Sequence, residues 1–243
     1  MLVVFNWKAH PLKKKTVLQL IASVNRGAKL FPKARIIVAP SFVDIESVGA
    51  LVAPSVMLAS QDVAVVSVGS HTGQVPSALL ARHGVRYVIV GHSERRRELR
   101  ETDALVAKKC ALAAEYNITP IVCVGEWART STHRAWLFVK KQLGSLKKSF
   151  LGPLIIAYEP VWAIGGHKTV DPDHAAAIAT EIKRYMHRQS KTNMVKVLYG
   201  GSVSGKTIES LCARSVFDGF LIGSVGLVPA QIEKIIRATN RRT

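Results

Sequence analysis

Residues 153–188 read PLIIAYEPVWAIGGHKTVDPDHAAAIATEIKRYMHR and hold one complete unit of the fold that the sequence predicts. The run over 153–158 is dense in Ile and Leu, which is typical of a parallel strand covered on both faces. A helix is predicted over Pro172–Arg188, because Asp171 can cap its first turn and proline suits the first helical position. This stretch therefore predicts a strand, a loop and a helix in that order.

The same alternation of strand and helix recurs along the whole chain. Helical patterns include Ala104–Tyr116 and Ala135–Lys148. Eight such units favour an α/β chain folded as a single-domain (β/α)8 barrel over residues 1–243, although the pattern alone also permits an open doubly wound sheet. The predicted strands are Leu2–Asn6, Arg35–Ala39, Val56–Ser60, Arg86–Val90, Thr119–Val124, Pro153–Tyr158, Val195–Tyr199 and Gly219–Gly223.

The composition excludes some classes of protein. Of the 243 residues 48% are hydrophobic, which excludes a disordered chain. The 34 Lys and Arg against 16 Asp and Glu give a formal net charge of +18. These basic residues are scattered from end to end without interleaved aromatic residues, so solvated helix faces are favoured over a nucleic-acid site. A field of this sign should still attract an anionic ligand.

Several absences in the sequence predict a cytoplasmic protein with no membrane span and no metal. No run approaches the roughly 18 apolar residues of a membrane span, and the chain opens without the basic leader of a secretory signal. Cys110, Cys123 and Cys212 are odd in number and widely spaced, which argues against a disulfide framework and against a cysteine metal knuckle. The eight histidines include no pair four residues apart.

Polar residues and glycines follow directly after the predicted strands. In barrels the loops at the carboxyl ends of the strands carry the chemistry. We therefore expect these residues to meet at one mouth, although each alone has an ordinary explanation as a solvated side chain or a turn. The positions are Asn6, Lys8, Gln61, His92, Glu126, Glu159, Gly200-Gly201 and Gly223.

Glu159 is the candidate general base. It ends an apolar strand and precedes the loop from Pro160 to Thr169, whose Val, Trp, Ala and Ile residues would be costly to leave in solvent without a purpose. We interpret this loop as a lid rather than a plain surface loop. A carboxylate under a lid can act as a base because its surroundings exclude water.

His92 is the candidate partner of that base. It lies between a predicted strand and a predicted helix, whose positive end would favour the neutral imidazole as a hydrogen-bond donor and acceptor. Taken alone, a histidine that only caps the helix would be the simpler interpretation. Glu94, two residues further on, could hold the ammonium of Lys8 in place.

Glycine turns follow the last two predicted strands, at Gly200-Gly201-Ser202 and Gly223-Ser224. Barrels commonly build a phosphate site there from backbone N–H groups, since glycine lets the backbone approach an anion closely. Turn geometry without a ligand is the alternative. Glycine at the same place in two successive units favours phosphate binding.

Six segments of the chain, taken in their order along the sequence, resemble the triosephosphate isomerase family. The resemblance extends over essentially the whole chain. The resemblance implies a single-domain (β/α)8 TIM barrel and the interconversion of dihydroxyacetone phosphate and D-glyceraldehyde 3-phosphate, a step of glycolysis and gluconeogenesis, without cofactor or metal. The segments are Asn6-Trp7-Lys8, residues 90–96 (VGHSERR), residues 123–126 (CVGE), residues 157–165 (AYEPVWAIG), residues 199–203 (YGGSV) and Asp218 to Gly223.

The resemblance also implies roles for single residues. Glu159 is similar to the base that moves a proton between C1 and C2, and His92 to the neutral electrophile. Lys8 and Asn6 correspond to the groups that bind substrate and steady the enediolate. Main-chain N–H groups would hold the phosphate, and further residues would lie behind the groups that touch substrate. The phosphate positions are Gly165, Ser202, Gly223 and Ser224, and the positions behind the site are Glu94, Cys123 and Glu126.

By the same resemblance we expect a homodimer in which Thr72 and Gly73 reach the partner's active site. The sequence departs from the family at four places. Gln74 replaces an acid after Thr-Gly, Gly166-His167 replaces Thr-Gly at the lid tip, Ser224 replaces a glycine, and Asp62 replaces an asparagine. Ser224 requires backbone dihedrals that suit a side chain. Asp62 would either weaken substrate binding through its charge or pair with an arginine.

Two other functions fit parts of the sequence. Another phosphate-binding barrel enzyme, such as a sugar-phosphate epimerase, would share the glycine turns but not the combination of Lys8, His92 and Glu159. A catalytically degenerate barrel that binds nucleic acid would use the basic surface instead.

Overall fold

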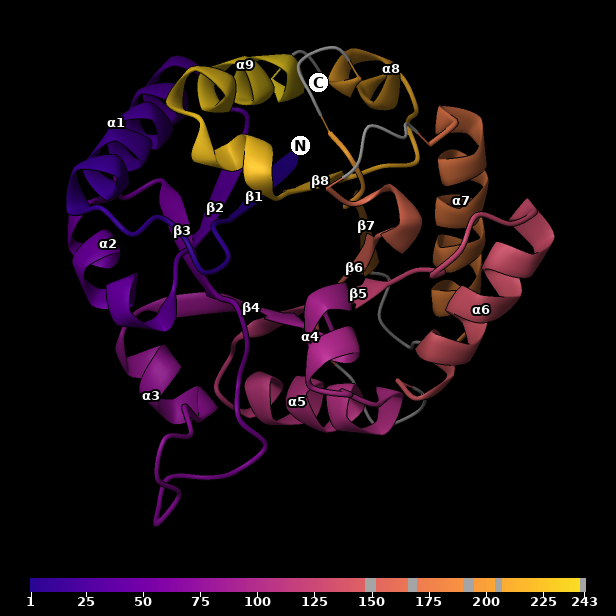
Figure 1. Cartoon of the computed structure of the whole chain (residues 1–243), viewed down its shortest axis with the longest axis horizontal. Coiled ribbons are helices and arrows are strands. Elements are labelled where there is room, and N and C mark those ends of the chain that lie inside the picture. Colours follow the sequence, from indigo (N-terminus) through magenta and orange to yellow (C-terminus); the bar gives the residue numbers. More distant parts are fainter. Residues whose placement is uncertain (147–151, 166–169, 190–194, 204–206, 241–243) are drawn as a thin grey trace.

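The computed structural model describes residues 1–146, 152–165, 170–189, 195–203 and 207–240. Eight parallel strands form a closed barrel in sequential order, since β1 pairs with both β2 and β8 (Figure 1). This confirms the predicted (β/α)8 TIM barrel and excludes the open sheet. The strands are β1 (Leu2–Asn6), β2 (Arg35–Ala39), β3 (Val56–Ser60), β4 (Val85–Val90), β5 (Thr119–Val124), β6 (Leu154–Tyr158), β7 (Val195–Tyr199) and β8 (Gly219–Ile222).

Helices form a ring around the barrel (Figure 1). The α-helices are α1 (Lys14–Leu30), α2 (Ile45–Leu51), α3 (Ser77–Arg82), α4 (Ser93–Glu98), α5 (Asp103–Glu115), α6 (Thr132–Gly144), α7 (Pro172–Gln189), α8 (Ile208–Cys212) and α9 (Pro229–Thr239). Short 3-10 helices lie at η1 (Phe42–Asp44), η2 (Val161–Ala163) and η3 (Ser224–Leu227). Among the described helices, none is both long and apolar enough to cross a bilayer.

The strands agree with the sequence predictions to within one residue at each end, and one predicted helix was misplaced. Helix α6 begins at Thr132 rather than Ala135, because the hydroxyl of Ser131 caps it by accepting a hydrogen bond from the N–H of Arg134. It ends at Gly144, before the predicted end at Lys148, which lies outside the described residues. The predicted cap of α7 forms, since Asp171 accepts a hydrogen bond from the N–H of Asp173 at 3.0 Å.

The strands divide the core into two layers because successive side chains point to opposite faces. In β1, Leu2 and Val4 point into the barrel, whereas Val3 and Phe5 pack under the surrounding helices. The interior cluster draws on every strand and contains small residues such as Ala39. This filled interior closes the barrel below the site and leaves the loops at the carboxyl ends of the strands to shape it.

Candidate active site

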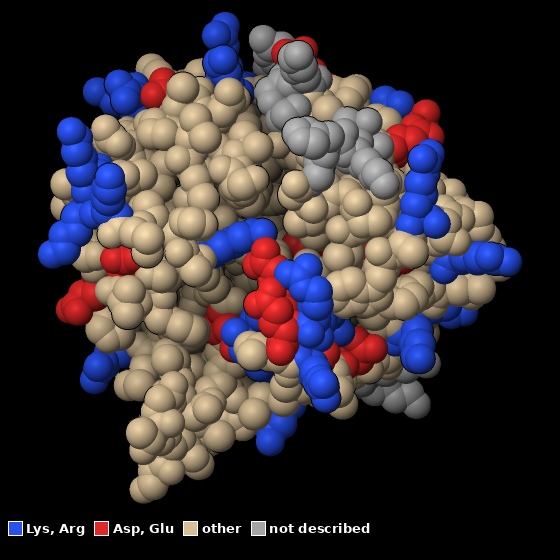
Figure 2. Space-filling view, viewed as in Figure 1, with Lys and Arg blue, Asp and Glu red and all other residues tan. Residues whose placement is uncertain are grey.

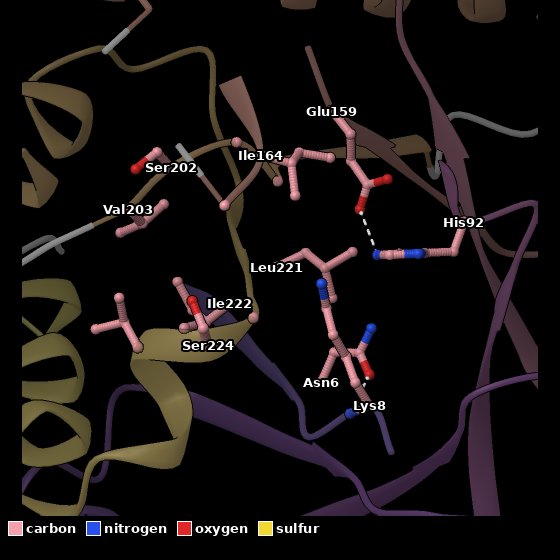
Figure 3. A pocket seen from close by; sticks show the side chains of 15 residues that line it. Asn6, Lys8, His92, Glu159, Ile164, Ser202, Val203, Leu221, Ile222 and Ser224 are labelled. Atoms are coloured by element: carbon pink, nitrogen blue, oxygen red, sulfur yellow. Dashed lines mark hydrogen bonds and ion pairs between the residues drawn. The ribbon is translucent and has the colours of Figure 1, made fainter. Parts of the chain in front are cut away.

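A cavity of about 310 Å³ opens at the carboxyl ends of the strands (Figure 3). It brings together the four predicted reacting groups and the four predicted phosphate positions, although these come from loops far apart in the sequence. The residues that line it are Asn6, Lys8, His92, Glu159, Ile164, Gly165, Gly200, Gly201, Ser202, Val203, Leu221, Ile222, Gly223, Ser224 and Val225.

Glu159 and His92 face each other across one side of this cavity (Figure 3). Oε1 of Glu159 lies 3.6 Å from Nε2 of His92, and the two residues are only 2% and 6% exposed. The N–H of Glu94 donates to Nδ1 of His92 at 3.3 Å, so in the neutral imidazole the proton resides on Nε2. The site therefore presents a buried carboxylate beside an imidazole N–H donor.

The ammonium of Lys8 enters the same cavity from β1. Its Nζ lies 2.5 Å from Oε1 of Glu94. Burial raises the pKa of Glu94, but the hydrogen bond from Lys8 and the nearby charges outweigh burial, and the net pKa is lowered. Glu94 therefore stays ionised and holds the ammonium at a fixed place.

The backbone of Lys8 adopts a left-handed conformation, with φ of 53°. A side chain is strained there, and the surrounding contacts must hold it. The N–H of Lys8 donates to Oδ1 of Asn6 at 3.0 Å, and its carbonyl accepts from Nε2 of Gln61 at 2.8 Å. The side chain of Gln61 thus binds the backbone of Lys8 and does not line the cavity, in contrast to the prediction from the sequence.

The opposite side of the cavity offers hydrogen-bond donors. Gly165, Ser202, Gly223 and Ser224 line it, and none of their N–H groups donates within the part of the chain that the structure describes. Backbone N–H groups of this kind suit an anion, because phosphate oxygens only accept hydrogen bonds. One end of the cavity can therefore hold a phosphate while the other presents a base, an imidazole and an ammonium.

Comparison with known proteins agrees with this geometry. The chain matches the model of the triosephosphate isomerase family over residues 1–239. The chain belongs to the triosephosphate isomerase family. It is 34% identical to the triosephosphate isomerase of Thermoanaerobacter sp. (strain X514), in an alignment that covers 95% of this chain and 96% of that protein.

Two further relatives extend the likeness. The triosephosphate isomerase of Nocardia farcinica (strain IFM 10152) is 37% identical over 93% of this chain and 91% of its own length. That of Coxiella burnetii (strain Dugway 5J108-111) is 34% identical over 99% and 97%. The family match favours neither another phosphate-binding barrel enzyme nor a nucleic-acid-binding barrel.

Three glycines of the family segments lie so close to Glu159 or Tyr199 that an added Cβ would overlap them. A Cβ on Gly200 would lie 2.7 Å from Cγ of Glu159, and a Cβ on Gly125 would collide with the carbonyl oxygen of Glu159. A Cβ on Gly201 would collide with the hydroxyl of Tyr199. A side chain at either residue of the pair Gly200-Gly201 would thus overlap a neighbouring side chain, which is a packing reason for glycine in addition to the predicted turn.

Glu126 does not face the cavity, in contrast to the expectation that every carboxylate after a strand points into one mouth. It is 3% exposed and accepts hydrogen bonds from the hydroxyl of Tyr158 and, at 2.8 Å, from Nε1 of Trp162. Burial raises the pKa of Tyr158, so its hydroxyl remains a donor. Glu126 therefore anchors the start of the predicted lid. The lid tip at Gly166-His167 lies outside the described residues.

Arg96 and Cys123 lie behind the reacting groups. Arg96 donates to the carbonyl of Gly91 at 2.6 Å and to Asp103 at 2.6 Å, which ties the loop before His92 to α5. Burial and the adjacent Glu159 carboxylate raise the pKa of Cys123 well above its usual value. Cys123 is thus an uncharged neighbour of the Glu159 carboxylate rather than a nucleophile.

Asp62 pairs with an arginine, which was one of the two outcomes expected for this departure from the family. Oδ2 of Asp62 lies 2.6 Å from Nη2 of Arg95, and its other oxygen contacts Lys109. Glu101 contacts the same two cations. Its pKa is lowered, because hydrogen bonds from Lys109 and Arg95 outweigh the effect of burial.

These four groups form a largely buried network that joins the loop after β3 to α4 and α5. Arg95, Glu101 and Lys109 were not predicted to join such a network, since charged residues usually face solvent. The pairing of charges across the network depends on contacts between loops and helices, for which a sequence pattern gives no signal.

Proposed function

We propose that this cavity interconverts dihydroxyacetone phosphate and D-glyceraldehyde 3-phosphate, with Glu159 as the base. Its carboxylate removes a proton from one carbon beside the carbonyl and returns that proton to the neighbouring carbon. Nε2–H of His92 donates a hydrogen bond to the carbonyl oxygen as the enediolate forms. It then gives its proton to that oxygen and takes the proton of the neighbouring hydroxyl, so the imidazole ends neutral and the carbonyl re-forms on the neighbouring carbon. The observation that carries this proposal is the 3.6 Å approach of Glu159 Oε1 to His92 Nε2 in a buried corner of the cavity.

The remaining groups bind the substrate and stabilise charge. The ammonium of Lys8 and the side-chain amide of Asn6 face the negative oxygen that develops in the enediolate. The N–H groups of Gly165, Ser202, Gly223 and Ser224, which donate to no partner among the described residues, would hold the phosphate. The proposed reaction moves protons within one molecule, so it consumes no co-substrate.

Three residues support this chemistry without touching substrate. Glu94 holds the ammonium of Lys8, and Cys123 packs against the Glu159 carboxylate. Glu126 fixes Trp162 at the start of the lid, which would exclude water from the enediolate. We propose that all three position the reacting groups.

The test is Glu159→Asp in a coupled assay of triose phosphate isomerisation. Shortening the side chain withdraws the carboxylate by roughly 1 Å, and such a misplacement lowers turnover by up to about 100-fold. We expect kcat to fall far more than substrate affinity. Equal losses in kcat and in binding would count against Glu159 as the base.

We propose a homodimer formed by the loops that follow β1 to β4. The loop after β3, which contains Thr72 and Gly73, projects from the molecule and carries no exposed charge (Figures 1 and 2). Large apolar side chains are exposed in the four adjacent loop regions and favour burial in an interface. They are Leu12 (93% exposed), Val43 (90%), Val68 (65%) and Leu99 (60%).

Sedimentation equilibrium tests this assembly. We expect a dimer for the native chain and a monomer for Val43→Glu, because a buried carboxylate without a partner is costly. A native monomer at micromolar concentration would contradict the proposal. The cytoplasm remains the location that we propose from the sequence.

A further inference from the structure

We propose that the side-chain hydroxyl of Ser224 is an additional ligand of the substrate phosphate. This inference rests on the proposed function, which places the phosphate at the donor-rich end of the cavity. The family resemblance implies only a main-chain N–H donor at this position, because the family has a glycine there and glycine has no side chain. In this chain the hydroxyl adds one donor to the site.

Ser224 lies on the correct side of the cavity for this role. Figure 3 shows Ser202 and Ser224 on one wall, across the cavity from Glu159 and His92. A Cβ on Gly223 would lie 3.8 Å from Nζ of Lys8, so the ammonium approaches the loop just before Ser224. A three-carbon substrate that reaches Glu159 at one end therefore places its phosphate against the wall with the two serines.

The hydroxyl of Ser224 is free to take a ligand. Within the described part of the chain, neither its Oγ nor its N–H has a hydrogen-bond partner. Among the residues that the structure describes, the non-glycine residues with positive φ are Lys8, Arg100 and Asn117, so Ser224 occupies a conformation that a side chain tolerates. A serine at position 224 requires backbone dihedrals that suit a side chain, and the structure has them.

A hydroxyl suits a phosphate dianion because its O–H donates while the phosphate oxygens only accept. Hydrogen bonds to charged groups are stronger than those between neutral groups, and about 1.4 kcal/mol corresponds to a tenfold change in affinity. Ser224 is exposed to solvent, which weakens the gain, because water competes for the same donor. We expect the hydroxyl to strengthen phosphate binding about tenfold.

The test measures binding of glycerol 3-phosphate, which carries the phosphate ester but has no carbonyl to isomerise. Calorimetric titration gives its Kd for the native protein and for Ser224→Ala, Ser224→Thr and the control Ser215→Ala. Ser215 is an exposed serine that precedes β8, at the opposite end of that strand from Ser224. Glycerol without phosphate serves as the ligand control.

We expect Ser224→Ala to raise the Kd about tenfold, Ser224→Thr to stay within about threefold of native, and Ser215→Ala to match native. In turnover assays the loss in Ser224→Ala should fall mainly in KM, as for an interaction made equally in ground and transition states. Equal Kd values for Ser224→Ala and the native protein would overturn this inference alone. Failure of the native protein to bind glycerol 3-phosphate would instead overturn the proposed phosphate site and function.

Discussion

Gly200→Ala should displace the carboxylate of Glu159, the proposed base, while leaving the fold intact. The new methyl carbon would lie 2.7 Å from Cγ and 3.2 Å from Oε1 of Glu159. Carbon atoms in contact normally lie about 3.5–4.0 Å apart, so the carboxylate must move by roughly 1 Å. The backbone of Gly200 is not in the left-handed region, so alanine can adopt its conformation. The hydrogen bond from its N–H to the carbonyl of Tyr158 can remain. The overlap is thus with a side chain that can turn away.

The magnitude follows from this displacement. A reacting group misplaced by about 1 Å can lower the rate about 100-fold, which corresponds to roughly 2.7 kcal/mol in the activation free energy. Three quantities are measured for each variant: kcat for triose phosphate isomerisation, the Kd for glycerol 3-phosphate and the urea concentration at the midpoint of unfolding. We expect kcat to fall about 100-fold, with smaller changes in Kd and stability.

Gly144→Ala is the matched control, because a Cβ at this last residue of α6 meets no atom within 4 Å. It should keep native turnover and gain up to about 1 kcal/mol of stability, since alanine is the better helix former. The reasoning is refuted when Gly200→Ala retains native kcat. It is also refuted when that variant loses stability and turnover together, because the added methyl group would then destabilise the folded protein instead of displacing only the Glu159 side chain.

Two further predictions concern buried carboxylates. Glu101→Gln should lower the free energy of unfolding by about 3 kcal/mol at pH 7, and the exposed control Glu98→Gln by less than about 0.5 kcal/mol. Because folding lowers the pKa of Glu101, its contribution is present above the ordinary carboxyl pKa and is lost as pH falls through the folded value, so the difference in urea stability should narrow below about pH 4. A difference independent of pH would contradict this. Trp162→Phe removes a hydrogen-bond donor to Glu126 and should lower the free energy of unfolding in urea by about 1–3 kcal/mol. The control Trp127→Phe changes an exposed tryptophan and should lower it little. Equal losses in the two variants would refute the anchoring role of Glu126.

The barrel was predictable because its information is local. Runs such as Leu154–Tyr158 are apolar throughout, and the helix from Pro172 carries its own cap and proline. Family segments also marked the cavity residues, since each follows a strand whose carboxyl end must face the same mouth. The error at α6 was local as well, because the cap at Ser131 was overlooked.

Other features depended on contacts between distant segments. Gln61 and Glu126 follow strands as the cavity residues do, yet Gln61 binds the carbonyl of Lys8 and Glu126 binds the lid tryptophan. The requirement for glycine at position 200 comes from the Glu159 side chain, 41 residues earlier in the chain. Patterns of neighbouring residues carry no measure of such clashes.

The order of strands and helices, and the residues at the strand ends, could be predicted from the amino-acid sequence, because hydrophobic periodicity, caps and turn residues act over a few positions. Which of those residues share a cavity, and which are buried behind it, depends on how the closed barrel brings distant segments together. The folded structure alone pairs Asp62 with Arg95 and Lys109, and it leaves the Ser224 hydroxyl without a partner among the described residues. Distances across the closed barrel set these relations, and closure is a property of all eight strands together.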